Sequence, residues 1–263
     1  MTRFGLPRPH GVAGVTLAQA AALVLPFLFV AANDPGRYTV LFGVALVASL
    51  VWEWVFARLR KRPPSFHGLT TALVVAIVAP PEIAVWQVVV TVSLGVIFGE
   101  LVFGGRGFGF LSPATVALAL LIISFPELSL PAPTRELALA TLPAAVLLWA
   151  LGLISERVIL SAVAATFAVL VASGQGIEPV TIATGLAFGL IFLICDPTMA
   201  AATNAGRWIY GALAGSLVGL FSVSGITTEA VIFAALMAGI FAPLVDHLVV
   251  LAHAYLRARR RNA

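Results

Sequence analysis

Charged residues and cysteine are both scarce in this sequence. Only 10% of its 263 residues are charged, whereas 61% are hydrophobic and the mean hydropathy is +1.08. Soluble domains carry about a quarter charged residues, so this composition excludes an ordinary soluble fold and indicates a chain dissolved in lipid. The single cysteine, Cys195, excludes an internal disulfide and an iron–sulfur cluster held by the cysteines of one chain.

The sequence also lacks the usual motifs of soluble enzymes. It contains no Walker loop, no dinucleotide fingerprint and no Ser-His-Asp grouping with plausible spacing. Asp246, His247 and His253 share a predicted helix, but their spacing does not give a metal-binding face, so we expect no metal site. The net charge is +4, and the basic residues lie at segment ends, which favours membrane lipid over nucleic acid as the partner.

Apolar runs separated by polar breaks predict an all-α polytopic membrane protein with about ten transmembrane segments, some of them short or broken. We interpret the first run as a retained helix rather than a signal peptide, because it is long enough to cross a bilayer. The segments are expected near residues 13–32, 38–57, 69–79, 83–103, 111–125, 136–154, 158–172, 180–195, 208–223 and 229–255.

The distribution of positive charge predicts the orientation of these segments. With both termini in the cytoplasm, thirteen Lys and Arg residues fall inside and only two, Arg37 and Arg135, fall outside. This bias follows the positive-inside rule and supports an even number of segments.

Two short segments suggest an inverted repeat. "GLTTALVVAIVAPPEI" begins at Gly68 and "GLAFGLIFLICDPTMA" at Gly185, and each reaches a proline twelve residues after its glycine, at Pro80 and Pro197. They are the third and eighth segments, so residues 1–125 and 126–263 are predicted to form two inverted five-helix repeats within one membrane domain. Matching interrupted segments indicate a cavity-lining site, although chance similarity between two alanine-rich helices remains an alternative.

The interruption in the eighth segment, "CDPTMAAATNAGR", predicts a re-entrant or cavity-lining turn. Lipid cannot satisfy free backbone groups, so such a turn must be buried in protein or face a wet cavity. We expect an ion pair between Asp196 and Arg207, and a polar pocket that faces the turn at residues 104–115. The polar residues of this segment are Asp196, Thr198, Thr203, Asn204 and Arg207.

Three stretches resemble the NqrB/RnfD family, membrane subunits of the sodium-pumping NADH:quinone reductase and of the Rnf electron-transport complex. They are "APPEIAVWQVVVTVSLGVIFGELVFGGRGFGFLSPATVALALLIISFP", "DPTMAAATNAGRWIYGALAGSLVGLF" and "FAALMAGIFAPLVDHL", which together cover roughly residues 68 to 250 in the family's order. The resemblance implies a bacterial inner-membrane protein that holds a flavin, passes electrons and, in the quinone reductase, handles quinone. It also implies partner subunits, including one that carries a flavin outside the cytoplasm, and allows coupling to ion transport.

The family motif in "GGRGFGFLSPAT" supplies further candidate cofactor-binding residues. Glycines such as Gly107 allow close backbone approach, and Phe108 and Phe110 could stack on an isoalloxazine or quinone ring. Ser112 precedes Pro113, which fits the first turn of a helix whose free N–H groups attract carbonyl oxygens. The alternative is a tight cytoplasmic turn with interfacial aromatic residues.

Thr134 is the remaining candidate. In the resembled family, a threonine within "(S/T)-G-A-T" carries phosphoester-linked FMN, but here the corresponding loop reads "PAPTREL". The glycine of the modification signature is missing, so we expect that Thr134 carries no covalent flavin and that riboflavin or FMN binds non-covalently.

These observations favour an electron-transfer component of a membrane redox complex, rather than a complete enzyme. A small-solute channel or transporter on the same repeat is the alternative, and a scaffold that has lost its cofactor is a third possibility. Glu53 and Glu100 lie near predicted cytoplasmic segment ends, where we expect them to reach water.

Overall fold

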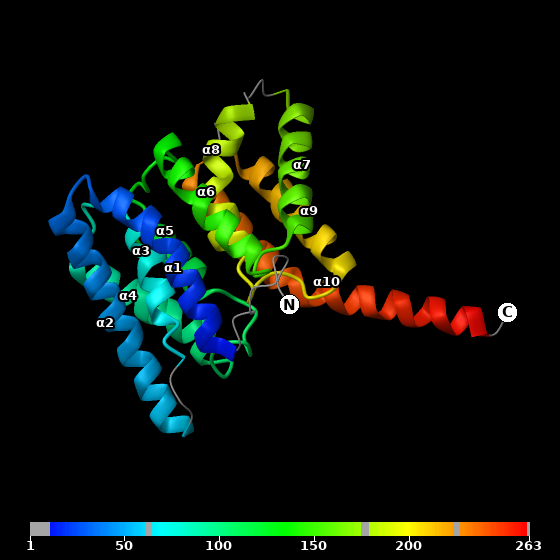
Figure 1. The fold of residues 1–263 in the computed structure, drawn as a ribbon, viewed down its shortest axis with the longest axis horizontal. Helices are drawn as coiled ribbons and strands as arrows, with labels where there is room; N and C mark the ends of the chain where they lie inside the picture. The colour runs from blue at the N-terminus through cyan, green and yellow to red at the C-terminus, as the bar shows by residue number, and fades with distance from the viewer. Residues whose placement is uncertain (1–10, 62–64, 175–178, 223–226, 262–263) are drawn as a thin grey trace.

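The computed structural model describes residues 11–61, 65–174, 179–222 and 227–261, which form α-helices and two π-helical turns without any strand (Figure 1). The first half comprises α1 (Gly11–Ala31), α2 (Pro35–Arg60), α3 (Gly68–Val78), α4 (Val85–Val96), the π-turn η1 (Ile97–Leu101) and α5 (Pro113–Ser124). The second half comprises α6 (Arg135–Ala150), α7 (Glu156–Ala172), α8 (Pro179–Gly189), the π-turn η2 (Leu190–Ile194), α9 (Asn204–Phe221) and α10 (Thr228–Arg261).

Each of the ten predicted segments is confirmed as a helix, with two notable differences at the ends. The ninth helix begins at Asn204 rather than near 208, because the Thr203 hydroxyl accepts a hydrogen bond from Gly206 N at 3.0 Å and caps the helix. The tenth continues to Arg261 rather than ending near 255. By length and composition, α1, α2 and residues 228–259 of α10 can each cross a membrane.

The short helices lie inside the bundle. Helix α3 has 11 residues, all of them buried except Leu69. At 1.5 Å per residue it rises only about 16 Å, roughly half of the hydrocarbon thickness. The predicted segment 69–79 corresponds to α3, and the predicted segment 180–195 corresponds to α8 and η2, so that Gly68 begins its helix whereas Gly185 lies within α8.

Glycines allow helix pairs to approach closely. A Cβ atom added to Gly215 of α9 would lie 2.0 Å from the backbone oxygen of Ala162 in α7, and one added to Gly95 of α4 would lie 2.5 Å from the Cβ of Ala117 in α5. Small residues at such crossings are typical of membrane helices, which associate through close packing rather than through exclusion of water.

Similar helix pairs pack together in the two halves. In the first half α1 packs against α3, α2 against α4, and α5 against both α3 and α4. In the second half α6 packs against α8, α7 against α9, and α10 against both α8 and α9. The halves meet through α1 and α6 and through α5 and α10, whereas the close packing of α2 on α3 has no counterpart of similar extent between α7 and α8 in the described residues.

Candidate functional site: a cavity beside the glycine turn

The segment between η1 and α5 is a turn built on glycines. Gly104, Gly105 and Gly107 have φ angles of 124°, 97° and 87°, which side-chain-bearing residues rarely adopt. The turn folds back on itself, so that the rings of Phe103 and Phe110 lie 5.1 Å apart. The backbone conformation of this turn therefore requires glycine at these three positions.

A cavity of about 400 Å³ opens beside this glycine turn. Helix α2 contributes Glu53, Phe56 and Arg60, and the far wall is formed by Glu100 and the turn itself. Phe108, of which 64% is exposed, lies at the rim. We call this space the glycine-turn cavity.

Both glutamates of this cavity are buried, with 4% exposure each, so the expectation that they reach water is wrong. Glu53 Oε1 accepts a hydrogen bond from the backbone N–H of Gly68, at the start of α3. Glu100 Oε2 lies 2.6 Å from His67 Nδ1. The reason is the shortness of α3: its N-terminus lies inside the protein, where its free N–H groups and His67 meet carboxylates instead of water.

Two residues that line the glycine-turn cavity each have a buried side-chain atom without a hydrogen-bond partner. These atoms are Glu53 Oε2 and Arg106 Nη1. The other terminal nitrogen of Arg106 donates to Gln19 Oε1 of α1, and Arg106 is only 8% exposed. Sequence reasoning missed both side chains as site residues, although an acidic residue within an apolar run was a signal for Glu53.

Ser112 and Asp196 lie elsewhere, on a second and much smaller cavity of about 10 Å³ between α1, α3 and η2. Pro113 is the first residue of α5, as predicted, but the Ser112 side chain makes no capping hydrogen bond. The cavity has room for about one water molecule. The predicted proximity of Asp196 to the glycine-turn segment is thus present, but without space for a ring.

The ion pair predicted between Asp196 and Arg207 is not formed by these described residues. Asp196 Oδ1 accepts hydrogen bonds from the backbone N–H of Thr198 at 2.8 Å and from its hydroxyl at 2.6 Å. Arg207 instead donates from Nε to the backbone oxygen of Ala201 at 3.2 Å. Each side chain is hydrogen-bonded to a nearby residue. The turn after Pro197 places the polar atoms of Thr198 next to Asp196, and Arg207 bonds to Ala201 instead.

The loop before α9 is fastened by Asp246 of α10. Asp246 Oδ1 accepts from the backbone N–H of Thr203 at 3.0 Å and from its hydroxyl at 2.6 Å, and Oδ2 accepts from Ala202 N at 2.7 Å. Asn204 Oδ1 accepts from the Arg157 guanidinium of α7. Thr203 and Asn204 therefore serve as helix-end contacts in this structure, and they lie apart from the glycine-turn cavity.

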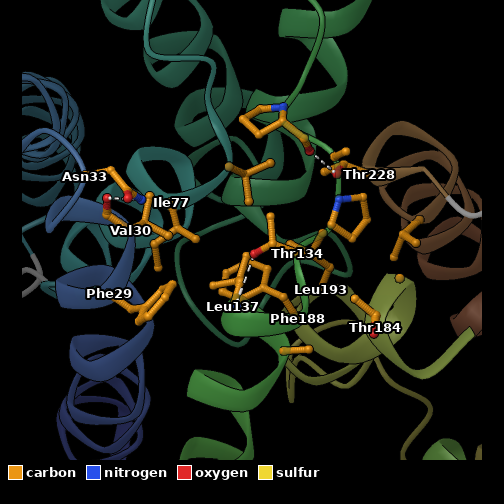
Figure 2. Close-up of a pocket in the computed structure, with 18 of the residues that line it drawn as sticks. Phe29, Val30, Asn33, Ile77, Thr134, Leu137, Thr184, Phe188, Leu193 and Thr228 are labelled. Carbon is orange, nitrogen blue, oxygen red and sulfur yellow. Dashed lines mark hydrogen bonds between the residues drawn. The ribbon is translucent and has the colours of Figure 1, made fainter. Parts of the chain in front are cut away.

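Thr134 caps α6 and lies on a third, apolar cavity of about 150 Å³ (Figure 2). Its hydroxyl accepts a hydrogen bond from Leu137 N at 3.2 Å. Figure 2 shows Phe188 and Leu193 of the second half close to Thr134, with Phe29 on the facing helix α1. The predicted site residues are therefore distributed over separate places rather than gathered in one pocket.

Apolar helices and half-length helices that end inside the bundle, where they meet buried charged side chains, define a polytopic α-helical membrane protein. The chain belongs to the NQR2, RnfD, RnfE family, whose model matches residues 8–131 and 132–254. This confirms the resemblance seen in the sequence motifs.

Individual relatives agree with the family assignment. The chain is 31% identical to the NqrB subunit of the Na(+)-translocating NADH-quinone reductase of Pseudomonas paraeruginosa, over 80% of this chain and 66% of the relative. It is 29% identical to the protein of the same name from Ectopseudomonas mendocina, over 83% of this chain and 68% of the relative. The chain thus spans about two thirds of the length of these relatives.

Proposed function

We propose that this protein is a membrane component of a bacterial NADH:quinone reductase-like or Rnf-like complex, and that it holds a flavin non-covalently in the glycine-turn cavity and relays electrons. The names of its relatives, which are subunits of a Na(+)-translocating NADH-quinone reductase, support membership of such a complex. The proposed partners are the other subunits, including a flavin-carrying extracytoplasmic one, and the proposed location is the inner membrane.

The observation that carries the flavin proposal is that two residues lining the cavity each have a buried atom without a hydrogen-bond partner, Glu53 Oε2 and Arg106 Nη1. A buried polar group without a partner costs about 1–3 kcal/mol. A ligand that presents one donor and one acceptor removes both costs. An anionic ligand group would be repelled by Glu53 and Glu100, and a cationic one by Arg106. A neutral ring with an N–H and a carbonyl is therefore the most compatible ligand group. The isoalloxazine ring carries both.

The size of the cavity also supports this assignment. Its volume of about 400 Å³ lies in the range of roughly 300–1,000 Å³ that is usual for small-molecule sites. Glu53 would accept from a ring N–H, and Arg106 would donate to a ring carbonyl. When bound, the flavin supplies the electron-transfer chemistry, while the protein supplies orientation and electrostatics. A quinone, with carbonyl acceptors alone, would leave Glu53 Oε2 without a donor.

We also propose that the two halves are inverted repeats and that both termini are cytoplasmic. The similar packing of helices in each half supports the first proposal, and the thirteen-to-two distribution of Lys and Arg supports the second. Reporter fusions at the C-terminus and within residues 127–135 should report opposite sides of the membrane. The same side for both would contradict this topology.

A channel, one form of the alternative function, requires a continuous polar path. The cavity between the halves at Gln19 and Asp196 measures only about 10 Å³, which leaves room for one water molecule. This observation favours the redox role over a channel.

The visible absorbance spectrum of the purified full-length protein tests the proposal, before and after acid precipitation. We expect flavin absorbance in the native sample and its release into the acid supernatant, because no covalent bond holds it. Native protein without flavin absorbance, purified with riboflavin or FMN present, would leave the transporter and the cofactor-free scaffold as the remaining functions.

A further inference from the structure

The C-terminal part of α10 extends beyond the helical bundle (Figure 1). Helix α10 has 34 residues, which corresponds to a length of about 51 Å at 1.5 Å per residue. About 20 residues are enough to cross the hydrocarbon core. More than ten residues therefore remain after a span that starts near Thr228, and they need a location of their own.

This extension presents exposed apolar side chains. Leu248, Leu251 and Tyr255 are exposed by 55%, 51% and 69%, and their spacing of three and four residues places them on one face of the helix. His253 and Arg257 lie on the opposite face, by the same 3.6-residue period. The extension is thus amphipathic apart from the exposed Val250 on the polar face and Arg259 on the apolar one, and none of the described residues covers Leu248, Leu251 and Tyr255.

The charge of the extension has one sign. No acidic residue follows Asp246 in the sequence, and the final seven residues include four arginines, at positions 257, 259, 260 and 261. A helix with an apolar face and a basic end lies in the interface of a membrane that contains anionic lipids. Pro243 removes a backbone hydrogen bond and permits a bend within the spanning part of α10, about one turn before the extension begins.

We propose that residues 247–261 lie along the membrane surface on the side of the C-terminus, with Leu248, Leu251 and Tyr255 among the acyl chains and the terminal arginines on anionic phospholipid headgroups. A membrane surface with anionic lipids explains both the positive charge and the apolar face of the extension. A soluble acidic partner would explain the positive charge. Without that partner, however, the apolar face of the extension would be exposed to water. This inference is independent of the flavin proposal.

Depth-dependent quenching tests the proposal on the full-length protein. A single cysteine is introduced as Leu251→Cys or, on the opposite face, as His253→Cys, and is labelled with the fluorophore NBD. The native Cys195 is buried, so unmodified protein carried through the same labelling is the control. The proteins are reconstituted into vesicles of phosphatidylcholine with or without one quarter phosphatidylglycerol, each containing lipids with a nitroxide on the acyl chain, below the headgroup.

We expect the label at position 251 to be quenched at least threefold more strongly than the label at 253, and more strongly when phosphatidylglycerol is present. Changing all four arginines to glutamine should remove the dependence on phosphatidylglycerol, while changing them to lysine should keep it, because lipid attraction requires charge rather than guanidinium geometry. Equal, weak quenching at both positions would overturn the proposal and indicate a helix that projects into water. Quenching that is indifferent to phosphatidylglycerol and to the arginines would overturn headgroup recognition.

Discussion

Both halves of the chain place an acidic side chain beside the N-terminus of a helix, but the two carboxylates differ in what remains free. Asp246 uses both oxygens at the start of α9, where it accepts from Ala202 N, Thr203 N and the Thr203 hydroxyl. Glu53 uses one oxygen at the start of α3, on Gly68 N, while its other oxygen is buried without a hydrogen-bond partner in a residue that lines the glycine-turn cavity. A fully satisfied carboxylate belongs to the scaffold, whereas a half-satisfied one beside a cavity is available to a ligand.

The largest expected effect on stability comes from Asp246→Ala. This change leaves Ala202 N and Thr203 N without their acceptor, and partial access of water limits the cost to about 2 kcal/mol of unfolding free energy. Chemical unfolding in detergent measures it, with His253→Ala of the same helix as the control. The flavin content per folded molecule should not change. Loss of flavin with unchanged stability would contradict the comparison, because it would assign a ligand-binding role to Asp246.

Glu53→Gln should give the opposite pattern. The amide oxygen still accepts from Gly68 N, so α3 keeps its contact, but the charged acceptor in the cavity is lost. We expect flavin binding to weaken at least tenfold, which corresponds to about 1.4 kcal/mol, with little change in unfolding. Fluorescence titration with riboflavin measures the affinity.

The matched control for this change is Glu82→Gln, on an exposed glutamate. Arg106→Gln should weaken flavin binding to a similar extent, with exposed Arg135→Gln as its control. Unchanged affinity in both cavity variants, in a protein that binds flavin, would place the flavin elsewhere.

Thr134→Ala should lower the unfolding free energy by about 1 kcal/mol, because the hydroxyl caps α6. Thr134→Ser keeps the capping oxygen and should restore most of the loss. Neither the native protein nor the variants should show a fluorescent flavin band after denaturing electrophoresis. A band that disappears in Thr134→Ala would show that the threonine carries flavin without the family's signature.

The smallest expected effect is the coupling between Asp196 and Arg207. Since Thr198 and Ala201 satisfy these side chains separately, the two alanine substitutions should be additive within about 0.5 kcal/mol. A double-mutant cycle on thermal or chemical unfolding measures the coupling. A double variant clearly milder than Asp196→Ala alone would establish the ion pair predicted from the sequence.

The helices were predictable because membrane segments are governed by local composition. Apolar runs such as residues 38–57 indicate segments that can be buried in lipid as helices. The prolines after α3 indicate where such a helix ends. Helix ends were less predictable, since the start of α9 depends on Thr203 and on a carboxylate from another helix. The glycines of the turn at 104–107 could be recognised as a close-approach segment, but not the cavity beside them.

The sequence by itself determined that this is a helical membrane protein, that some of its helices are too short to cross, and that it belongs to a recognisable family of redox-complex proteins. Only the tertiary structure decided which polar side chains are satisfied and which are free. Glu53 reaches Gly68 over 15 residues and Arg106 reaches Gln19 over 87, and no periodic pattern specifies such contacts. Hydropathy records the cost of burying a polar group, but the partner that offsets this cost is chosen by packing.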